Sequence, residues 1–397
     1  MRIHCRLLLC MFACSLSVQP AAGQSETLKA SMQPFIDAGD LSGLVTFVGD
    51  KNGVVDVQVL GMADLENMVP MKRDTVFRIA SMTKPITALA IAQLVDEGKL
   101  NFDDPVEKCL PEFKGQMLLA SKEGDTVTLK KPSRPIAVKD LLTHTSGLPF
   151  YPAGMADVYQ KRDRTLSETT IAVSQAPLTF EPGTHWSYCN SGIDTLGRIV
   201  EVVSGMPYET FLATRIFEPL GMVDTTPYPT AEQLRRVAVT YAKEPSGKLV
   251  ARPGGVLDFA RGAKHPVPAG GLFSTGDDLA RLYGCLLNKG TLDGTKIIDE
   301  KTLADMTSIH TGDLKAGFID GSTWGYGFGI VKESTGVTEN LSPGSYGHGG
   351  AYGTQGWIDP TKGIYTILLI QRSGLPNSDG SAMRKALHDG SVTLVKQ

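Results

Sequence analysis

The segment 77–94 constrains the fold most, because it joins a strand-like stretch to a helix and places two reactive residue types at the junction. The pattern predicts an amphipathic helix over 83–97. Ser81 and Lys84 are three positions apart, so on a helix they lie on one face, one turn from each other. A serine needs a neighbouring base to act as a nucleophile, and a partly desolvated lysine can supply that base. The same residues also fit a capped helix start with a solvated lysine.

A polar loop over 185–192 precedes a predicted helix over 193–203 and contains Tyr188 and Asn190. These two residues are two positions apart, so in an extended loop their side chains point to one side. A phenol beside an ammonium can have its pKa lowered enough to act as a base. An asparagine amide can hold either a substrate carbonyl or the lysine.

A glycine-rich stretch over 347–353 is flanked by strand-like sequence and contains His348, Gly349, Gly350 and Ala351. Glycines within a strand pattern often mark the close approach of another backbone or of a ligand. Such a stretch can supply one backbone N–H of an oxyanion hole.

Together, Ser-x-x-Lys, Tyr-x-Asn and His-Gly-Gly, in this order, resemble the three motifs of the penicillin-recognising serine hydrolases. This group includes class C β-lactamases, D-Ala-D-Ala carboxypeptidases, D-aminopeptidases and the β-lactamase-like (family VIII) esterases. The resemblance runs from about residue 32 to about residue 395. Four further stretches are similar to the group, at 141–148, 182–183, 217–222 and 268–275.

The resemblance implies a role for each motif residue. Ser81 is the nucleophile that forms an acyl-enzyme, and Lys84 accepts its proton or keeps Tyr188 ionised. Tyr188 passes the proton to the leaving group, and Asn190 orients the substrate and Lys84. The backbone N–H groups of Ser81 and Ala351 form the oxyanion hole. Whether Lys84 or Tyr188 is the general base stays open, because two coupled groups titrate as a pair.

The third motif departs from the β-lactamase pattern, which is usually Lys-Thr-Gly and binds the carboxylate of the β-lactam. Here His348 replaces the lysine and Gly349 replaces the threonine, followed by Gly350. A mostly neutral imidazole is a poor partner for a carboxylate, so the departure favours neutral acyl substrates. The double variant His348→Lys with Gly349→Thr should then narrow the preference for a short neutral ester over a cephalosporin. Alternatively, His348 is only a hydrogen-bonded residue of a strand and takes no part in catalysis.

The resemblance implies a three-layer α+β fold of the β-lactamase/transpeptidase type. Strand-like patterns near both chain ends predict an antiparallel sheet built from about 24–80 and 276–397, flanked by helices. A mainly helical region, about 81–275, is inserted between them, within one hydrolase domain over 24–397. The site is expected in the cleft at the junction, with Gly349 on the sheet edge.

Residues 1–23 resemble a signal peptide, with Arg2 and Arg6, an apolar run over 7–18 and a small-residue site at 21–23. We therefore expect a periplasmic or secreted protein that begins near Gln24. The apolar run is too short to span a membrane. A formal net charge of −3 without a basic patch gives nucleic-acid binding little support.

The remaining cysteines and histidines offer no metal-ligand spacing, and we expect no metal and no cofactor. Cys189 is interpreted as a small spacer, and His144 and His185 as loop or core residues. Four aromatic residues could line an acyl pocket or simply pack: Trp186, Trp324, Tyr326 and Tyr352.

The leading hypothesis is an exported serine hydrolase, a carboxylesterase acting on small esters. A β-lactamase, a D-Ala-D-Ala carboxypeptidase or a D-aminopeptidase is the enzymatic alternative. A catalytically silent binding protein that uses the same cleft is the alternative from another class. In each case the partner is a small acyl compound, an ester or possibly a β-lactam or D-amino-acid peptide.

Overall fold

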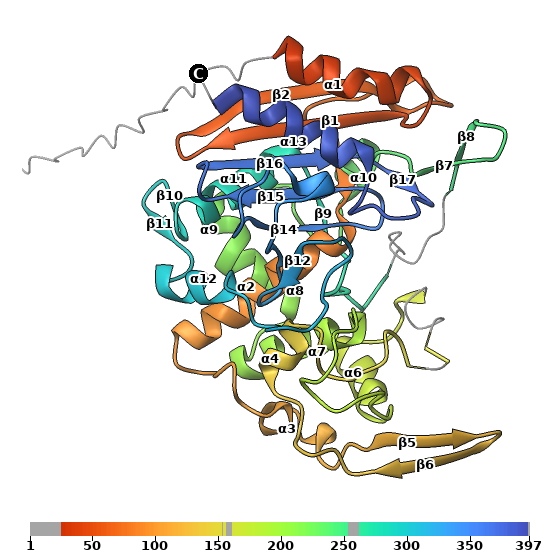
Figure 1. Cartoon of the computed structure of the whole chain (residues 1–397), viewed down its shortest axis with the longest axis vertical. Coiled ribbons are helices and arrows are strands. Elements are labelled where there is room, and N and C mark those ends of the chain that lie inside the picture. Colours follow the sequence, from red (N-terminus) through yellow and green to blue (C-terminus); the bar gives the residue numbers. More distant parts are fainter. Residues whose placement is uncertain (1–24, 153, 156–160, 253–261, 396–397) are drawn as a thin grey trace, which may run out of the picture.

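An eight-stranded antiparallel sheet, built from the two ends of the chain, lies at the centre of one part of the molecule (Figure 1). The computed structural model describes residues 25–152, 154–155, 161–252 and 262–395. In spatial order the strands are β12 (Ser322–Trp324), β13 (Gly329–Val331), β14 (Tyr346–Gly349), β15 (Gln355–Asp359), β16 (Ile364–Leu369), β1 (Gly43–Asp50), β2 (Gly53–Asp64) and β3 (Val69–Pro70).

Helices cover both faces of this sheet, and the alternation of side chains along β1 shows how. Leu44 and Val48 point to the face that is covered by α1 and α13, whereas Val45 and Phe47 belong to the main core on the other face, where α11 packs. The three layers are therefore α1 with α13, the sheet, and α11 (Figure 1). These helices are α1 (Glu26–Asp37), α11 (Gly276–Leu287) and α13 (Ala382–Val395).

The inserted region below the sheet is mainly helical (Figure 1). Its helices are α2 (Thr83–Asp96), α3 (Val106–Cys109), α4 (Val138–Leu142), α6 (Leu166–Ser174), α7 (Asn190–Ser204), α8 (Tyr208–Leu212), α9 (Glu218–Leu220) and α10 (Ala231–Arg236). Helix α12 (Glu300–Met306) packs against α2. The short strands outside the main sheet are β4 (Phe77–Arg78), β7 (Tyr241–Lys243), β8 (Leu249–Ala251), β9 (Phe273–Ser274), β10 (Thr291–Leu292), β11 (Thr295–Lys296) and β17 (Arg372–Ser373).

Helix α2 corrects the expectation of an amphipathic helix. Every residue from Thr83 to Leu94 is buried, including the polar Thr87 and Gln93. The helix packs against α7, α8, α12 and β14, so it runs through the interior and has no solvent face over these turns. The Thr87 hydroxyl donates to the carbonyl of Pro268 at 2.8 Å, and Gln93 Nε2 donates to the carbonyl of Ile297 at 2.7 Å.

A hairpin in the middle of the chain was not predicted. Strands β5 (Leu118–Glu123) and β6 (Thr126–Lys130) pair through a two-residue turn at Gly124, whose φ is 59°. The hairpin extends away from the helical region (Figure 1). Both strands are exposed over most of their length, so no alternation between core and solvent marks them in the sequence.

The predicted fold class is confirmed, as is the origin of the sheet in both chain ends. The Asn-Gly pair at 52–53, which is typical of a hairpin turn, joins β1 to β2. Several boundaries move by a few residues; most notably, the helix expected at 193–203 begins at Asn190. Among the described residues, no helix is long and apolar enough to cross a lipid bilayer.

Candidate active site

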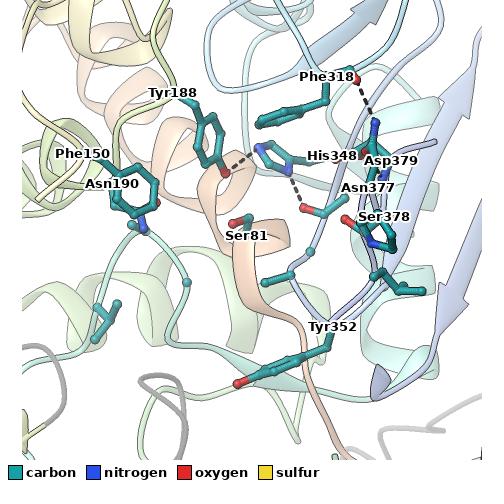
Figure 2. Close-up of a pocket in the computed structure, with 18 of the residues that line it drawn as sticks. Ser81, Phe150, Tyr188, Asn190, Phe318, His348, Tyr352, Asn377, Ser378 and Asp379 are labelled. Atoms are coloured by element: carbon teal, nitrogen blue, oxygen red, sulfur yellow. Dashed lines mark hydrogen bonds between the residues drawn. The ribbon is translucent and has the colours of Figure 1, made fainter. Parts of the chain in front are cut away.

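Ser81 lies in a short 3-10 turn, residues Ala80–Met82, that leads directly into α2. The preceding residue, Ala80, is buried and has a φ of 48°, a left-handed conformation that costs energy for any residue with a Cβ. This turn presents Ser81 to a cavity of about 560 Å³ (Figure 2). Backbone strain of this kind often accompanies functional sites.

Lys84 lies one turn after Ser81 and is fully buried, which rules out the solvated lysine that the sequence left open. Its Nζ is 3.1 Å from Ser81 Oγ, 2.7 Å from Asn190 Oδ1 and 2.6 Å from the carbonyl oxygen of Ala269. Burial lowers the pKa of Lys84 to about 7, although the charge of Asp194 acts in the opposite direction. Lys84 therefore exists in substantial part as a neutral amine near neutral pH.

The three neighbours of Lys84 match the hydrogen-bonding capacity of a neutral amine. The oxygen atoms of Asn190 and Ala269 can only accept, so they take the two N–H bonds of the amine. The nitrogen lone pair is then left for the hydroxyl hydrogen of Ser81. This arrangement can deprotonate the serine without any movement of a heavy atom.

Asn190 is oriented from its other end. Its Nδ2 donates to the hydroxyl of Tyr151 at 2.7 Å, which fixes the amide so that Oδ1 faces Lys84. We expected Asn190 in an extended loop, but it is the first residue of α7. The Sγ of Cys189 caps this helix by accepting from the N–H of Gly192. Cys189 itself is extended, and this still brings Tyr188 and Asn190 to the same cavity.

Tyr188 lies beside Lys84, whose Nζ is 4.6 Å from the centre of the phenol ring. We considered that this neighbour could lower the phenol pKa. Instead, burial raises the pKa of Tyr188 well above its usual value, and the opposing hydrogen bond with Ser81 does not compensate. Tyr188 therefore stays protonated at neutral pH and can donate a proton, whereas Lys84 can accept one.

His348 lies in β14, with Nε2 3.5 Å from the hydroxyl of Tyr188 (Figure 2). Its Nδ1 donates to the carbonyl of Gly349 at 2.6 Å, so Nε2 is the unprotonated acceptor. Burial lowers the pKa of His348 to about 3, and the neighbouring Lys84 contributes. His348 is therefore a neutral imidazole, as expected, and its Nε2 can accept a hydrogen bond from the Tyr188 hydroxyl.

The third-motif strand is held directly against the turn that carries Ser81. The Thr354 hydroxyl donates to the Ile79 carbonyl at 3.1 Å, and a Cβ on Gly350 would come within 2.6 Å of the same oxygen. This close approach requires glycine. It brings Ala351 to the cavity that Ser81 lines.

We expected Gly349 at the edge of the sheet, but its strand, β14, is not an edge strand. Strand β14 lies between β13 and β15, but its register with β13 ends at Gly347. Beyond that point one side of β14 is free to face the cavity.

A threonine at position 349 would require neighbouring side chains to move. A Cβ on Gly349 would overlap the carboxylate oxygen Oδ1 of Asp379 and lie 2.5 Å from Gln355 Nε2. The expectation that His348→Lys with Gly349→Thr narrows the preference between substrates stays a prediction, and the variant would have to displace the Asp379 and Gln355 side chains.

The cavity lies between the helical region and the sheet (Figure 2). The helical region supplies its aromatic and polar wall, including Phe150, Tyr188 and Asn190. The sheet side supplies its glycine-rich wall and the loop that carries Asp379. The residues that line it are Ser81, Phe150, Tyr151, Tyr188, Asn190, Val267, Ala269, Gly270, Phe318, His348, Gly349, Gly350, Ala351, Tyr352, Leu375, Pro376, Asn377, Ser378 and Asp379.

Comparison with known proteins identifies the family. The family described as Beta-lactamase matches residues 28–389, most of the chain. This chain belongs to the beta-lactamase family.

Named relatives of the chain include esterases. Esterase EstB of Burkholderia gladioli is 30% identical over 399 residues, which cover 93% of this chain and 96% of EstB. Lovastatin esterase of Penicillium rubens is 34% identical over 284 residues, 67% of this chain and 69% of that protein. The solved structure of EstCE1, described as a hydrolase with promiscuous acyltransferase activity, has a TM-score of 0.76 at 24% identity and covers 92% of this chain.

The other residues that we singled out mostly serve this beta-lactamase-family site indirectly. His144 is buried, as expected for a core histidine, whereas His185 is exposed. Burial raises the pKa of Cys189, so its thiol is inert beside a buried amine. Among the described residues, no three His, Cys, Asp or Glu side chains are grouped to hold a metal ion.

Of the four aromatic residues considered for an acyl pocket, Tyr352 lines the cavity. Trp186 and Trp324 instead pack together, with ring centres 5.3 Å apart, behind Tyr188. Tyr326 stacks on His310.

Sequence reasoning missed three groups that shape the site. The carbonyl of Ala269 is a backbone atom in the stretch 268–275, which resembled the family but gave no hint of its partner. Tyr151 orients Asn190 from a loop with no motif. Asp379 comes from a loop near the C-terminus and meets the third motif only in the folded chain.

Proposed function

We propose that this chain is a carboxylesterase that hydrolyses small neutral esters through an acyl-enzyme on Ser81. Lys84 takes the proton from Ser81 Oγ as the oxygen attacks the ester carbonyl carbon. The N–H groups of Ser81 and Ala351 hold the oxyanion, which is worth several kcal/mol. Tyr188 gives a proton to the departing alkoxide and is reprotonated by the Lys84 ammonium, so both groups return to their neutral forms. Neutral Lys84 then takes a proton from the water that attacks the acyl-enzyme, and this proton passes to Ser81 Oγ as the acid leaves.

The observation that carries the esterase proposal is the charge of the cavity wall. None of the described residues that line the cavity is a lysine or an arginine, and His348 is neutral. A β-lactam or a peptide C-terminus brings a carboxylate, which costs several kcal/mol to desolvate without a cationic partner. A neutral ester has no such cost. The names of the relatives EstB and lovastatin esterase support the same proposal.

Turnover of matched substrates tests this proposal. We expect kcat/KM for p-nitrophenyl butyrate to exceed that for a chromogenic cephalosporin by at least about a hundredfold, roughly 2.7 kcal/mol in transition-state binding. A D-Ala-D-Ala peptide should also be a poor substrate. Preference for the cephalosporin or the peptide would refute the esterase proposal. No turnover of any acyl substrate would favour the binding protein.

We also propose that the chain is exported after removal of its first residues. The positive and apolar pattern over 1–23 supports this, and it lies outside the described residues. The mass of the product from the culture medium or periplasm should correspond to a start near Gln24. A product that keeps Met1 and stays in the cytoplasm would contradict the proposal.

A further inference from the structure

The loop between β17 and α13 places a carboxylate in the cavity wall. Asp379 lies beside Gly349 and His348, on the side of the cavity formed by the sheet (Figure 2). Its side chain is 16% exposed. Because an oxygen of Asp379 fills the space that a side chain at position 349 would take, the carboxylate reaches the third motif itself.

The loop that carries Asp379 is fixed by several hydrogen bonds. Asn377 Oδ1 accepts from the backbone N–H of Asp379 at 3.0 Å and from that of Gly380 at 3.1 Å. Gln355 Nε2 donates to the Ser378 carbonyl at 3.0 Å and contacts Asp379 Oδ1 at 3.4 Å. The carboxylate is therefore held in place before a substrate arrives.

One oxygen of Asp379 remains available to a ligand. Oδ2 receives no hydrogen bond from the described residues and is not fully buried. A purely structural aspartate would be expected to pair closely with its buried cation. Here Arg384 donates to the backbone carbonyl of Asp379 at 2.8 Å and forms only a long ion pair with Oδ1, at 3.9 Å.

The cation behind Asp379 does not reach the cavity. Arg384 is fully buried, and its guanidinium lies 3.9 Å from the centre of the Trp357 ring. Lys84 is buried behind Ser81, and His348 is neutral. Among the described residues that line the cavity, Asp379 is the one with a carboxyl side chain. Burial raises the pKa of this carboxyl group, and the charge of Arg384 and the hydrogen bond from Gln355 act in the opposite direction. The Asp379 carboxylate sets the sign of the potential that a substrate meets there.

We propose that Asp379 is a specificity-determining residue that rejects anionic substrates and favours cationic substrates of the same size. A substrate carboxylate beside the third motif meets a fixed like charge in a partly desolvated wall. An ammonium group at the same place meets an acceptor that is already positioned. This inference rests on the proposed ester hydrolysis, and it names the charge class of the ester.

Two matched ester series test the inference. The first series consists of p-nitrophenyl esters whose acyl chains differ at the far end. The neutral member is the 5,5-dimethylhexanoate, which ends in a tert-butyl group. The cationic member is the 4-trimethylammoniobutyrate, and the anionic member is the monoester of adipic acid, which ends in a carboxylate. In the second, butyrate is esterified to a phenol that bears a carboxamide, a trimethylammonium group or a carboxylate. In at least one series, wild-type kcat/KM should be at least about tenfold higher for the cation than for the anion. A wild-type preference for the anion overturns the inference.

The variant Asp379→Asn keeps the shape of the side chain and removes its charge. Its cation-to-anion ratio of kcat/KM should fall by at least about tenfold, and Asp379→Glu should restore part of it. The ratio within each variant cancels a general loss of activity. The control Asp125→Asn removes the same charge at the exposed tip of the β5–β6 hairpin and should leave the ratio unchanged. Equal ratios in wild type, Asp379→Asn and Asp125→Asn overturn the inference.

A binding readout separates this inference from the proposed function. Phenylboronic acids with a meta carboxylate, carboxamide or trimethylammonium group can be titrated by calorimetry, without turnover. Hydrolysis of the neutral ester without charge discrimination overturns the role of Asp379 alone. If no ester is hydrolysed, the proposed function fails, and the order of the boronic acid affinities then decides on Asp379. Equal affinities, or no binding, count against it.

Discussion

At the scale of single residues, the site depends on one buried lysine. Lys84 has no solvent contact, and two of its three oxygen neighbours are acceptors that hold its N–H bonds. A charged ammonium would be strongly desolvated there, so the neutral amine is favoured. Tyr188 is shifted in the opposite sense, toward the neutral phenol. The sequence left Lys84 and Tyr188 as alternatives for the general base. Their surroundings favour Lys84 as the proton acceptor and Tyr188 as the proton donor.

The first prediction concerns the pH dependence of kcat/KM for a neutral ester. Lys84 must be deprotonated to act as the base, and its pKa is about 7. Below that value the ammonium form accumulates, so kcat/KM should fall about tenfold per pH unit as the pH decreases. Initial rates between pH 5 and pH 9 measure this limb. A profile that is flat down to pH 5 would remove Lys84 as the base.

The second prediction separates Tyr188 from Lys84. Tyr188→Phe removes the proton donor, so kcat should fall by about 10²- to 10⁴-fold, but the acidic limb near pH 7 should remain because Lys84 remains. Lys84→Ala should abolish that limb together with most of the activity. Adding Lys84→Ala to Ser81→Ala should cost almost nothing more, because residues that act as a unit are not additive. Loss of the limb in Tyr188→Phe would make the phenol the base.

At the scale of elements, His144 holds the loop that carries Tyr188. The His144 carbonyl accepts from the N–H of Ser187 at 2.9 Å, and Nδ1 accepts from the N–H of Cys189 at 3.2 Å. The His144 ring also packs on the Tyr188 ring, with centres 4.5 Å apart. The residue before and the residue after Tyr188 are therefore bound to the same histidine, which has a left-handed φ of 58°.

The third prediction compares two substitutions of His144. Asparagine has an acceptor at the same position as Nδ1 and tolerates a left-handed φ, whereas leucine offers neither property. His144→Leu should lower kcat by about ten- to a hundredfold with a smaller change in KM, because Tyr188 moves. His144→Asn should restore much of the loss. Equal kcat values for the two variants would mean that His144 only fills space; thermal midpoints measured alongside separate general destabilisation.

The elements also show where sequence reasoning succeeds and where it stops. Ser81, Tyr188 and Asn190 line one cavity, and Lys84 contacts Ser81 and Asn190 from behind it. Spacing predicted the pairs within each motif, whereas the family resemblance implied that the motifs meet. The burial of α2 on every side was missed, because an apolar stripe looks the same on a surface helix and on an interior one. The Ala269 carbonyl and the Asp379 carboxylate were missed because tertiary contacts alone bring them to the site.

At the scale of the whole molecule, the cavity depends on both halves of the fold. The helical region supplies Tyr188 and Asn190, and the sheet supplies His348 (Figure 2). Ala351 follows the same strand, and Ser81 lies in the turn before α2. No single segment of the chain contains the site. This arrangement follows from a sheet that is closed by the two chain ends around an inserted region, as patterns near both ends predicted.

The central claim is that Ser81 is the nucleophile, and covalent labelling tests it most directly. A fluorophosphonate reacts with an activated serine and leaves a stable adduct, which intact mass and peptide mapping locate. We predict one equivalent on the peptide that contains Ser81, a labelling rate that falls below about pH 7 with the protonation of Lys84, and no adduct in Ser81→Ala. An adduct on another residue, or ester hydrolysis that persists in Ser81→Ala at a rate near wild type, would contradict the account.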